Sequence, residues 1–236
     1  REIYAVETGL SSDPPMNWRL SALDGITLIS NSDAHSPSKI GREATIFDRS
    51  ISYGSIKDAI LTRKGYLGTV EFFPEEGKYH HDGHKACGVS FSPAETRQHG
   101  EICPLCLKKV TIGVMNRVEK LADRGEGHRP DGAPLFHSLI PLQELIAETL
   151  KVGASSKKVG KAYQALLEQL GNEHTILMDS PLDDIERAGS PLLRETVARM
   201  RAGNVRIVPG YDGEYGKVRT FVDSERNEAK WQMQLL

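Results

Sequence analysis

Short apolar runs alternate with a helical pattern over the first 73 residues. Three β-rich apolar runs bounded by turn residues predict buried strands at 3–6, 26–29 and 67–73. Between the last two runs, the apolar positions of residues 53–64 follow one helical face, with Ser52 as the cap and Gly65 at the end. This alternation of strand and helix favours an α/β domain with parallel strands.

Helical patterns dominate from residue 113 to the end. The helices that we expect lie at 114–124, 141–150, 156–170, 182–187 and 191–202. Two short apolar runs predict strands at 175–178 and 205–208, and a turn follows at 209–213. The pattern therefore indicates a mainly helical domain over residues 113–236.

Residues 74–112 differ from both flanks, because they hold all three cysteines and four of the eight histidines. No segment here is long enough to build a core alone, and a domain this small usually needs a staple such as zinc. The chain is therefore expected to have three parts: an α/β part at 1–73, a zinc-binding module at 74–112 and the helical domain.

Four residues of this module have the spacing of a zinc site. His84 and Cys87 form one pair and Cys103 and Cys106 the other, so that the whole pattern is H-x2-C-x15-C-x2-C. Each pair can form a tight knuckle, and the spacer is typical of structural zinc. A closed set of four ligands would make the site structural, and thiolate ligands indicate a reducing compartment, here taken as the cytoplasm.

Other assignments of the fourth ligand stay open. Ser90 stands three residues after Cys87, where a second cysteine would complete a C-x2-C pair, and a site that relied on it would be defective. His84 restores the count, with His80 and His81 in reserve. A remnant that binds no metal is the remaining alternative.

A second candidate site follows the run at 26–29. Asp33 and His35 are two residues apart, so both side chains would point to one face of an extended backbone and could bind the same divalent metal. Glu7 ends the first predicted strand and is expected beside them, as a ligand, a neighbour of the ligands or a substrate contact. In the loop after it, Ser11 and Ser12 could contact a substrate. For the pair Asp33 and His35, the competing interpretation is an Asx turn followed by a surface histidine. For Glu7 it is a buried carboxylate paired to an arginine.

Composition limits the class of protein. The 236 residues carry 30 Lys and Arg against 32 Asp and Glu, a net charge of −2, and 39% are hydrophobic. This excludes a wholly disordered chain and a broadly basic nucleic-acid coat. No run approaches the roughly 20 apolar residues of a membrane span, and no signal peptide is visible.

Local charge differs from this balanced total. Two runs, 151–167 and 102–118, contain lysines or arginines and no acid. The candidate DNA-backbone contacts in these runs are Lys108, Lys109, Ser156, Lys157 and Lys158. Ser156 opens a helix, where free N–H groups favour a phosphate. A solvated helix face is the alternative for both runs. Four aromatic residues could stack on a displaced base, although the strand residues among them also suit a core: Phe72, Phe73, Tyr79 and Tyr211.

The motif Asn31-Ser32-Asp33-Ala34-His35 resembles the last metal-binding motif of the PHP (polymerase and histidinol phosphatase) superfamily. Further segments resemble the endonuclease Q family within it: YAVETGLSSDPPMNWR, GITLISNSDAHSPSKIGREATIFD, VEFFPEEGKYHHDGHKACG, CPLC, NRVEKLADR, SLIPLQELIAE, SSKKV and VPGYDGEYGK. The resemblance implies a distorted β/α barrel with up to three divalent metal ions (Zn, Mn or Mg), a zinc finger and a helical C-terminal region. It also implies a metal-dependent DNA repair endonuclease that cuts 5′ to a deaminated base (uracil, hypoxanthine, xanthine) or an abasic site.

The sequence departs from the family in its early ligands. The PHP pattern begins with an H-x-H, yet His35 is the first histidine of this chain, which starts at Arg1 inside a predicted strand. We therefore expect the C-terminal part of a PHP barrel, in a fragment that cannot assemble the multinuclear centre alone. Two other functions remain: a PHP phosphoesterase acting on a small phosphate ester, and a non-catalytic zinc-containing DNA-binding module. The oligomeric state is left open.

Overall fold

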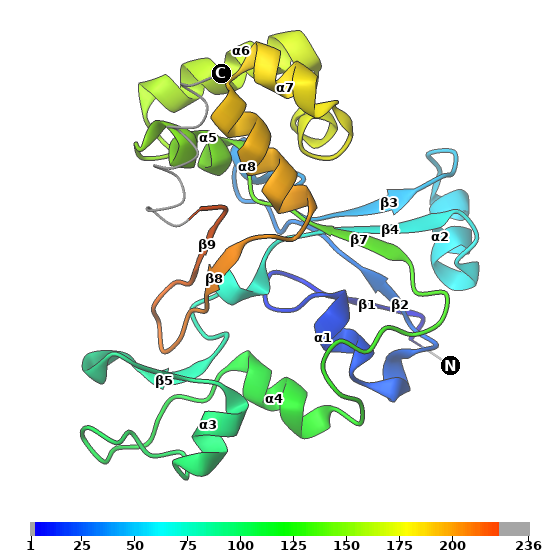
Figure 1. Ribbon diagram of the computed structural model, residues 1–236. Helices are drawn as coiled ribbons and strands as arrows, with labels where there is room; N and C mark the ends of the chain where they lie inside the picture. Colours follow the sequence, from blue (N-terminus) through cyan, green and yellow to red (C-terminus); the bar gives the residue numbers. More distant parts are fainter. Residues whose placement is uncertain (1–2, 222–236) are drawn as a thin grey trace. The chain divides into compact units, whose positions relative to one another are not determined.

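The computed structural model describes residues 3–221, which form two compact units (Figure 1). The first unit comprises residues 3–137 and 208–217, and the second comprises residues 138–207 and 218–221. Residues 1–2 and 222–236, which belong to the outer two of the three expected domains, lie outside the described residues. The boundaries expected at 73/74 and 112/113 stay predictions, and the helix that begins at Val114 lies in the first unit.

The first unit opens with two parallel strands. β1 (Ala5–Glu7) pairs with β2 (Thr27–Ile29), with Glu7 opposite Ile29. The short helix α1 (Pro14–Trp18) lies between them in sequence, and the Asp13 side chain caps it by accepting the Met16 N–H. The two strands expected here are therefore confirmed, and their parallel pairing brings their carboxyl ends to one edge.

A second sheet has the strand order β3-β4-β7. Its strands are β3 (Ala44–Phe47), β4 (Tyr66–Glu71) and β7 (Leu135–Ser138), and α2 (Tyr53–Thr62) connects the first two. β3 and β4 are antiparallel, so the expectation of parallel strands was wrong for this pair. The pattern also missed β3 and β7, which are four-residue strands whose side chains are not fully buried. Gly68 allows β7 to approach, because a Cβ there would lie 1.9 Å from the Leu135 carbonyl oxygen.

The module with the cysteines also belongs to this unit. β5 (Asp82–His84) and β6 (Val89–Phe91) form an antiparallel hairpin, followed by α3 (Pro93–Gln98) and α4 (Val114–Leu121). Figure 1 shows α3 and α4 near β5 at one end of this unit. Ser92 and Glu95 form a capping box at the start of α3. The remaining short elements of this unit are η1 (Ser21–Leu23), η2 (Pro37–Lys39), η3 (Pro74–Glu76) and η4 (Lys85–Cys87). The paired strands β8 (Arg206–Val208) and β9 (Lys217–Arg219) each include residues of both units.

The second unit is helical. Its elements are α5 (Leu142–Leu150), α6 (Lys157–Leu170), η5 (Thr175–Asp179), α7 (Leu182–Ala188) and α8 (Pro191–Arg201). α8 packs against α5 and α7, and α6 packs against the same two helices. Their apolar faces bury a core that includes Leu142, Leu145, Leu166, Ile185 and Val197.

One element of this unit was predicted wrongly. Residues 175–178 were expected to form a strand, but Thr175–Asp179 is a turn of π-helix. Ile176 and Leu177 are buried, and a short buried apolar run has the same pattern in a strand and in a helix. Within residues 3–221, no helix is long and apolar enough to cross a membrane.

Candidate functional site

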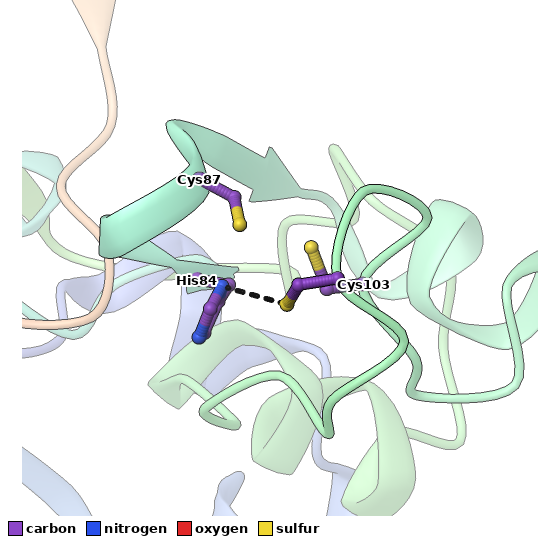
Figure 2. A group of neighbouring side chains, drawn as sticks. His84, Cys87 and Cys103 are labelled. Carbon is purple, nitrogen blue, oxygen red and sulfur yellow. Dashed lines mark hydrogen bonds between the residues drawn. The ribbon is translucent and has the colours of Figure 1, made fainter.

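The four residues with zinc spacing come together in space. Their ligand atoms all lie within 4.8 Å of one another, although they come from separate segments of the first unit. His84 ends β5, Cys87 ends η4, and Cys103 and Cys106 lie in the loop after α3. Figure 2 shows the side chains of His84, Cys87 and Cys103 turned toward a common centre.

Local backbone geometry builds each half of this cluster. Gly88 follows Cys87 with φ +66°, a left-handed conformation that glycine adopts readily. In the other half, the Cys103 N–H donates to the Lys108 carbonyl and the Leu107 N–H donates to the Cys103 carbonyl, both at 2.8 Å. These bonds close the loop around the two sulfurs, and Cys103 is fully buried against Phe91 and Val110.

The pKa values of two thiols in the cluster shift in opposite directions, and the hydrogen bond with Cys106 raises the pKa of Cys87 to about 11. Burial alone would raise the pKa of the Cys103 thiol, but the backbone N–H groups of Cys106 and Leu105 lower it below its ordinary value. The His84 Nδ1 lies 3.5 Å from the Cys106 Sγ, marked by the dashed line in Figure 2, so Nδ1 is the ring nitrogen that faces the sulfurs. Three thiols and an imidazole form a tetrahedral donor set for zinc, and the residues present therefore fit a structural metal site.

The alternatives for the fourth ligand lie elsewhere. Ser90 is exposed on β6, and His80 is buried with its ring stacked on that of His81 at 5.5 Å between centroids. None of the three belongs to the cluster. The choice of His84 from spacing therefore agrees with the geometry.

The Asp33–His35 segment does not have the backbone that was expected. β2 ends at Ile29, and Asp33 has φ +44°, outside the extended region. The His35 Nδ1 lies 2.8 Å from the Asp33 carbonyl oxygen, and both side chains are exposed. The assumption of an extended backbone was wrong because the chain turns after β2, where the Arg42 Nε donates to the Ser32 carbonyl at 3.2 Å. The roles of Asp33 and His35 as metal ligands stay predictions.

Glu7 ends β1 and is exposed. Over residues 3–221, the cluster at His84 is the only group of three or more metal-binding side chains that share one centre. Glu7, Asp33 and His35 therefore do not form a three-ligand group among the described residues, and their roles at a metal centre stay predictions.

Two buried carboxylates near Glu7 were missed by the sequence analysis. Glu71 ends β4 and is fully buried, where it accepts a 2.9 Å hydrogen bond from the Thr8 hydroxyl. Glu43 is 2% exposed, and neither of its oxygens accepts a hydrogen bond of ordinary geometry from another described residue. The strand ends thus carry more carboxyl groups than the D-x-H motif suggests.

Burial raises the pKa of both carboxyl groups. Burial raises the pKa of Glu71 to about 8, and the negative charge of Glu43 contributes to the rise. Burial likewise raises the pKa of Glu43 to about 7, with a contribution from Glu7, while Arg42 opposes it. A carboxyl group with such a pKa can hold or release a proton near neutral pH. An acid inside the apolar run 67–73 was the one sequence signal for Glu71.

The predicted substrate contacts in the loops and helix starts fall into two groups. The Ser12 hydroxyl donates to the Thr8 carbonyl at 2.8 Å, and the Ser156 hydroxyl accepts the Val159 N–H as the cap of α6. These two hydroxyls therefore hold local structure. The other five are exposed: Ser11, Lys108, Lys109, Lys157 and Lys158. Their contacts with DNA stay predictions.

Among the four aromatic candidates for base stacking, the exposed fraction assigns one side chain to the core and one to the surface. Phe73 is 8% exposed and belongs to the core, whereas Tyr79 is 53% exposed. Stacking by any of the four stays a prediction.

A cavity of about 420 Å³ lies elsewhere in the first unit. Its lining includes Thr27 at the start of β2 and Tyr66 at the start of β4, together with Trp18 and Arg129. These are the opposite strand ends from Ile29 and Glu71. The cavity is therefore separate from the carboxylates at the strand ends.

Relatives of known sequence match most of this chain. A family profile described as the MJ0043 C-terminal domain matches residues 141–204. Over 221 residues, the chain is 33% identical to the protein MJ0043 of Methanocaldococcus jannaschii, covering 90% of this chain and 28% of that protein. Over 223 residues, it is 30% identical to the protein YqxK of Bacillus subtilis, covering 92% of this chain and 53% of that protein.

Two solved structures share the fold. The lesion-specific endonuclease PfuEndoQ from Pyrococcus furiosus matches with a TM-score of 0.83 and 28% identity, over 96% of this chain and 59% of that chain. An endonuclease Q complex with a 27-mer duplex, which carries an abasic lesion at the active site, matches with a TM-score of 0.79 and 29% identity, over 95% of this chain and 57% of that chain.

The chain thus spans less than two thirds of the length of both curated relatives and of both solved chains. The resemblance to endonuclease Q that the sequence motifs indicate is confirmed by the two solved structures. In sequence and in fold, this chain is similar to part of endonuclease Q.

Proposed function

We propose that the chain is part of a metal-dependent DNA repair endonuclease. In this proposal, the enzyme hydrolyses the phosphodiester 5′ to a deaminated base (uracil, hypoxanthine or xanthine) or to an abasic site. The observation that carries the proposal is the similarity to lesion-specific endonuclease Q over 96% of the chain. The similar structure of an endonuclease Q in complex with an abasic duplex supports DNA as the partner.

In this function, Asp33, His35 and Glu7 would supply part of a divalent metal centre. Divalent metals at such a centre would activate a water molecule for attack on the phosphodiester. Glu71 and Glu43 lie at the neighbouring strand ends, where a protonated carboxyl could donate a hydrogen bond that a carboxylate cannot. These two residues would therefore tune the charge of the site.

Zinc at His84, Cys87, Cys103 and Cys106 would have a structural role. A closed set of four protein ligands leaves no open position for water or substrate. The metal would cross-link the hairpin β5–β6 to the loop after α3, and so hold the exposed Lys108 and Lys109 in place for contact with the phosphate backbone.

We further propose that the 236-residue chain alone binds DNA without cutting it. This follows from the failure of Glu7, Asp33 and His35 to form a three-ligand group. The test uses the purified zinc-loaded chain with Mn²⁺ and end-labelled duplexes that contain uracil, hypoxanthine, an abasic site or no lesion. We expect affinity that falls with salt, as phosphate contacts require, and no nicked product.

The outcomes separate the parts of this proposal. Nicking 5′ to a lesion would contradict the inactivity of the isolated chain while supporting the endonuclease function. Absence of binding to every duplex at low salt would contradict the DNA-directed function. Equal binding to all four duplexes without nicking would favour the non-catalytic DNA-binding module.

A further inference from the structure

The loop that carries two of the zinc ligands exposes two leucines. We define this zinc loop as residues 103–109. In it, Leu105 is 70% exposed and Leu107 is 77% exposed, whereas Cys103, the first residue of the loop, is fully buried. Leu105 stands just before Cys106 and Leu107 just after it. The two apolar side chains therefore lie at the surface of a loop whose interior is fixed by the ligands.

The backbone conformation at Leu107 indicates that a leucine at this position does not stabilise the fold. Its φ is +60°, a left-handed conformation that disfavours a bulky side chain and suits glycine. The same position in the other half of the site, directly after Cys87, is Gly88 with φ +66°. The equivalent left-handed position in the other half of the site is therefore occupied by glycine, as the backbone conformation favours.

Leu107 also gains nothing from burial, because most of its side chain is in solvent. Its backbone N–H makes the bond to the Cys103 carbonyl that closes the loop, and glycine would make the same bond. A strained and exposed leucine is therefore unfavourable for the isolated fold, and such outliers cluster at sites of contact with other molecules.

The charge next to these leucines indicates what the contact is. Lys108 and Lys109 follow directly, both are exposed, and neither forms an ion pair with another residue in the described range. The surrounding segment, residues 102–118, contains no acid. An apolar tip beside unpaired cations matches DNA, whose phosphates attract the lysines and whose base stack accepts apolar wedges.

We infer that Leu105 and Leu107 form an apolar wedge that enters the base stack at a DNA lesion, while Lys108 and Lys109 contact the adjacent phosphates. A site without a base, or with a displaced base, leaves a gap in the stack that apolar side chains can fill at little unstacking cost. The wedge would therefore favour damaged over intact DNA. This inference rests on the proposed DNA-directed function.

The test compares affinity for a duplex with one abasic site and for the matched intact duplex, using the full chain. Leu107→Gly is the informative variant, because it removes the wedge and relieves the backbone strain together. We expect it to keep its zinc and its melting temperature, or to melt higher, and to lose about tenfold in preference for the abasic duplex. Leu105→Ser should lose preference in the same direction.

The lysines should behave differently from the leucines. Lys108→Gln with Lys109→Gln should weaken binding to both duplexes alike and reduce the slope of log affinity against log salt by about two. Ile51→Ser is the matched control, since Ile51 is a 99% exposed apolar residue outside the zinc loop. It should leave both affinities unchanged.

The outcomes distinguish this inference from the function on which it rests. If the unmodified chain prefers the abasic duplex and both leucine variants keep that preference, the wedge is overturned and the DNA-directed function stands. If the unmodified chain binds neither duplex, the proposed function itself fails. If the leucine variants instead abolish self-association in sedimentation, without a change in DNA preference, the leucines contact a second copy of the chain and the wedge is overturned.

Discussion

Two carboxyl groups at the strand ends are buried where most proteins place apolar side chains. Glu71 is fully buried and Glu43 nearly so, and the pKa values of about 8 and about 7 both lie well above that of an exposed glutamate. Burial disfavours the charged form of each, so the folded chain holds protons that the unfolded chain has already released.

This difference predicts a pH-dependent stability. Glu71 binds its proton up to about pH 8 in the folded chain but only to about pH 4.5 when unfolded, so the contribution of Glu71 to stability is fully present below about pH 4.5 and is lost as the pH rises toward 8. Glu71→Gln removes the titrating group and keeps an acceptor for the Thr8 hydroxyl. Urea unfolding at pH 5 to 8 should therefore show a smaller loss of stability in the variant than in the unmodified chain.

The control for this measurement is Glu168→Gln, which changes an exposed glutamate on α6. Its unfolding curves should keep the pH dependence of the unmodified chain. Parallel curves for Glu71→Gln and the unmodified chain would contradict the assignment of the titration to Glu71.

The cluster of cysteines makes a second prediction at the scale of single residues. Zinc under reducing conditions should be present at about one per chain and be lost in Cys103→Ser, because a hydroxyl does not replace the thiolate ligand. Ser90→Ala is the matched control, since Ser90 is exposed outside the cluster, and it should retain the metal. Metal analysis of the dialysed proteins measures this. Equal zinc in Cys103→Ser and the unmodified chain would refute the ligand set.

At the scale of elements, one side chain joins three parts of the cysteine-containing module. Asp82 begins β5 and is fully buried. It accepts bonds from the Thr96 hydroxyl of α3 at 2.5 Å, from the Gly113 N–H at 2.6 Å and from the Asn116 amide of α4 at 2.7 Å. The two helices are thus held to the hairpin by a single carboxylate.

Asp82→Ala should therefore destabilise the chain strongly. The substitution leaves three buried donors without their acceptor, and each such group costs about 1–3 kcal/mol. We expect a loss of at least about 2 kcal/mol in the free energy of unfolding, measured in urea. Asp58→Ala, at an exposed position on α2, should change it by less than about 0.5 kcal/mol. Similar losses in both variants would show that Asp82 does not hold the helices.

The sequence predicted most elements where local signals agree. Ser52 and Ser156 both cap helices as expected, and Gly171 ends α6, because capping depends on a few neighbouring residues. The π-helix at Thr175–Asp179 was taken for a strand, since burial hides the period of a short run. β3 and β7 were missed, because their pairing with β4 is set by residues distant in sequence.

The candidate sites were also predicted only where the signal is local in sequence. Ligand spacing within each knuckle is local, so His84, Cys87, Cys103 and Cys106 could be found from the sequence. Glu43 and Glu71 could not, because their proximity and burial depend on how strands pack. The exposed loop at Asp33 also departs from the strand geometry that the alternation of side chains assumed.

At the scale of the whole molecule, the two units have different sources of stability. The second unit has an apolar core from α5, α6, α7 and α8, whereas the cysteine-containing part of the first has only the small cluster of Phe91, Cys103 and Val110. A core that small usually needs a staple such as a metal. Removal of the metal should therefore destabilise the cysteine-containing part of the first unit and leave the second unit stable.

Hydrogen exchange before and after chelation measures this division. Under reducing conditions, a zinc chelator should reduce the protection of amides in β5, β6, α3 and α4 by about tenfold or more, because loss of the metal lowers the cost of local opening. Amides in α5 to α8 should keep their protection, since their core contains none of the ligands. The Cys103→Ser variant should show the exchange pattern of the chelated chain and not respond to chelator. Equal loss of protection in α5 to α8 would show that the helical unit depends on the metal as well, and would contradict the separate origin of its stability.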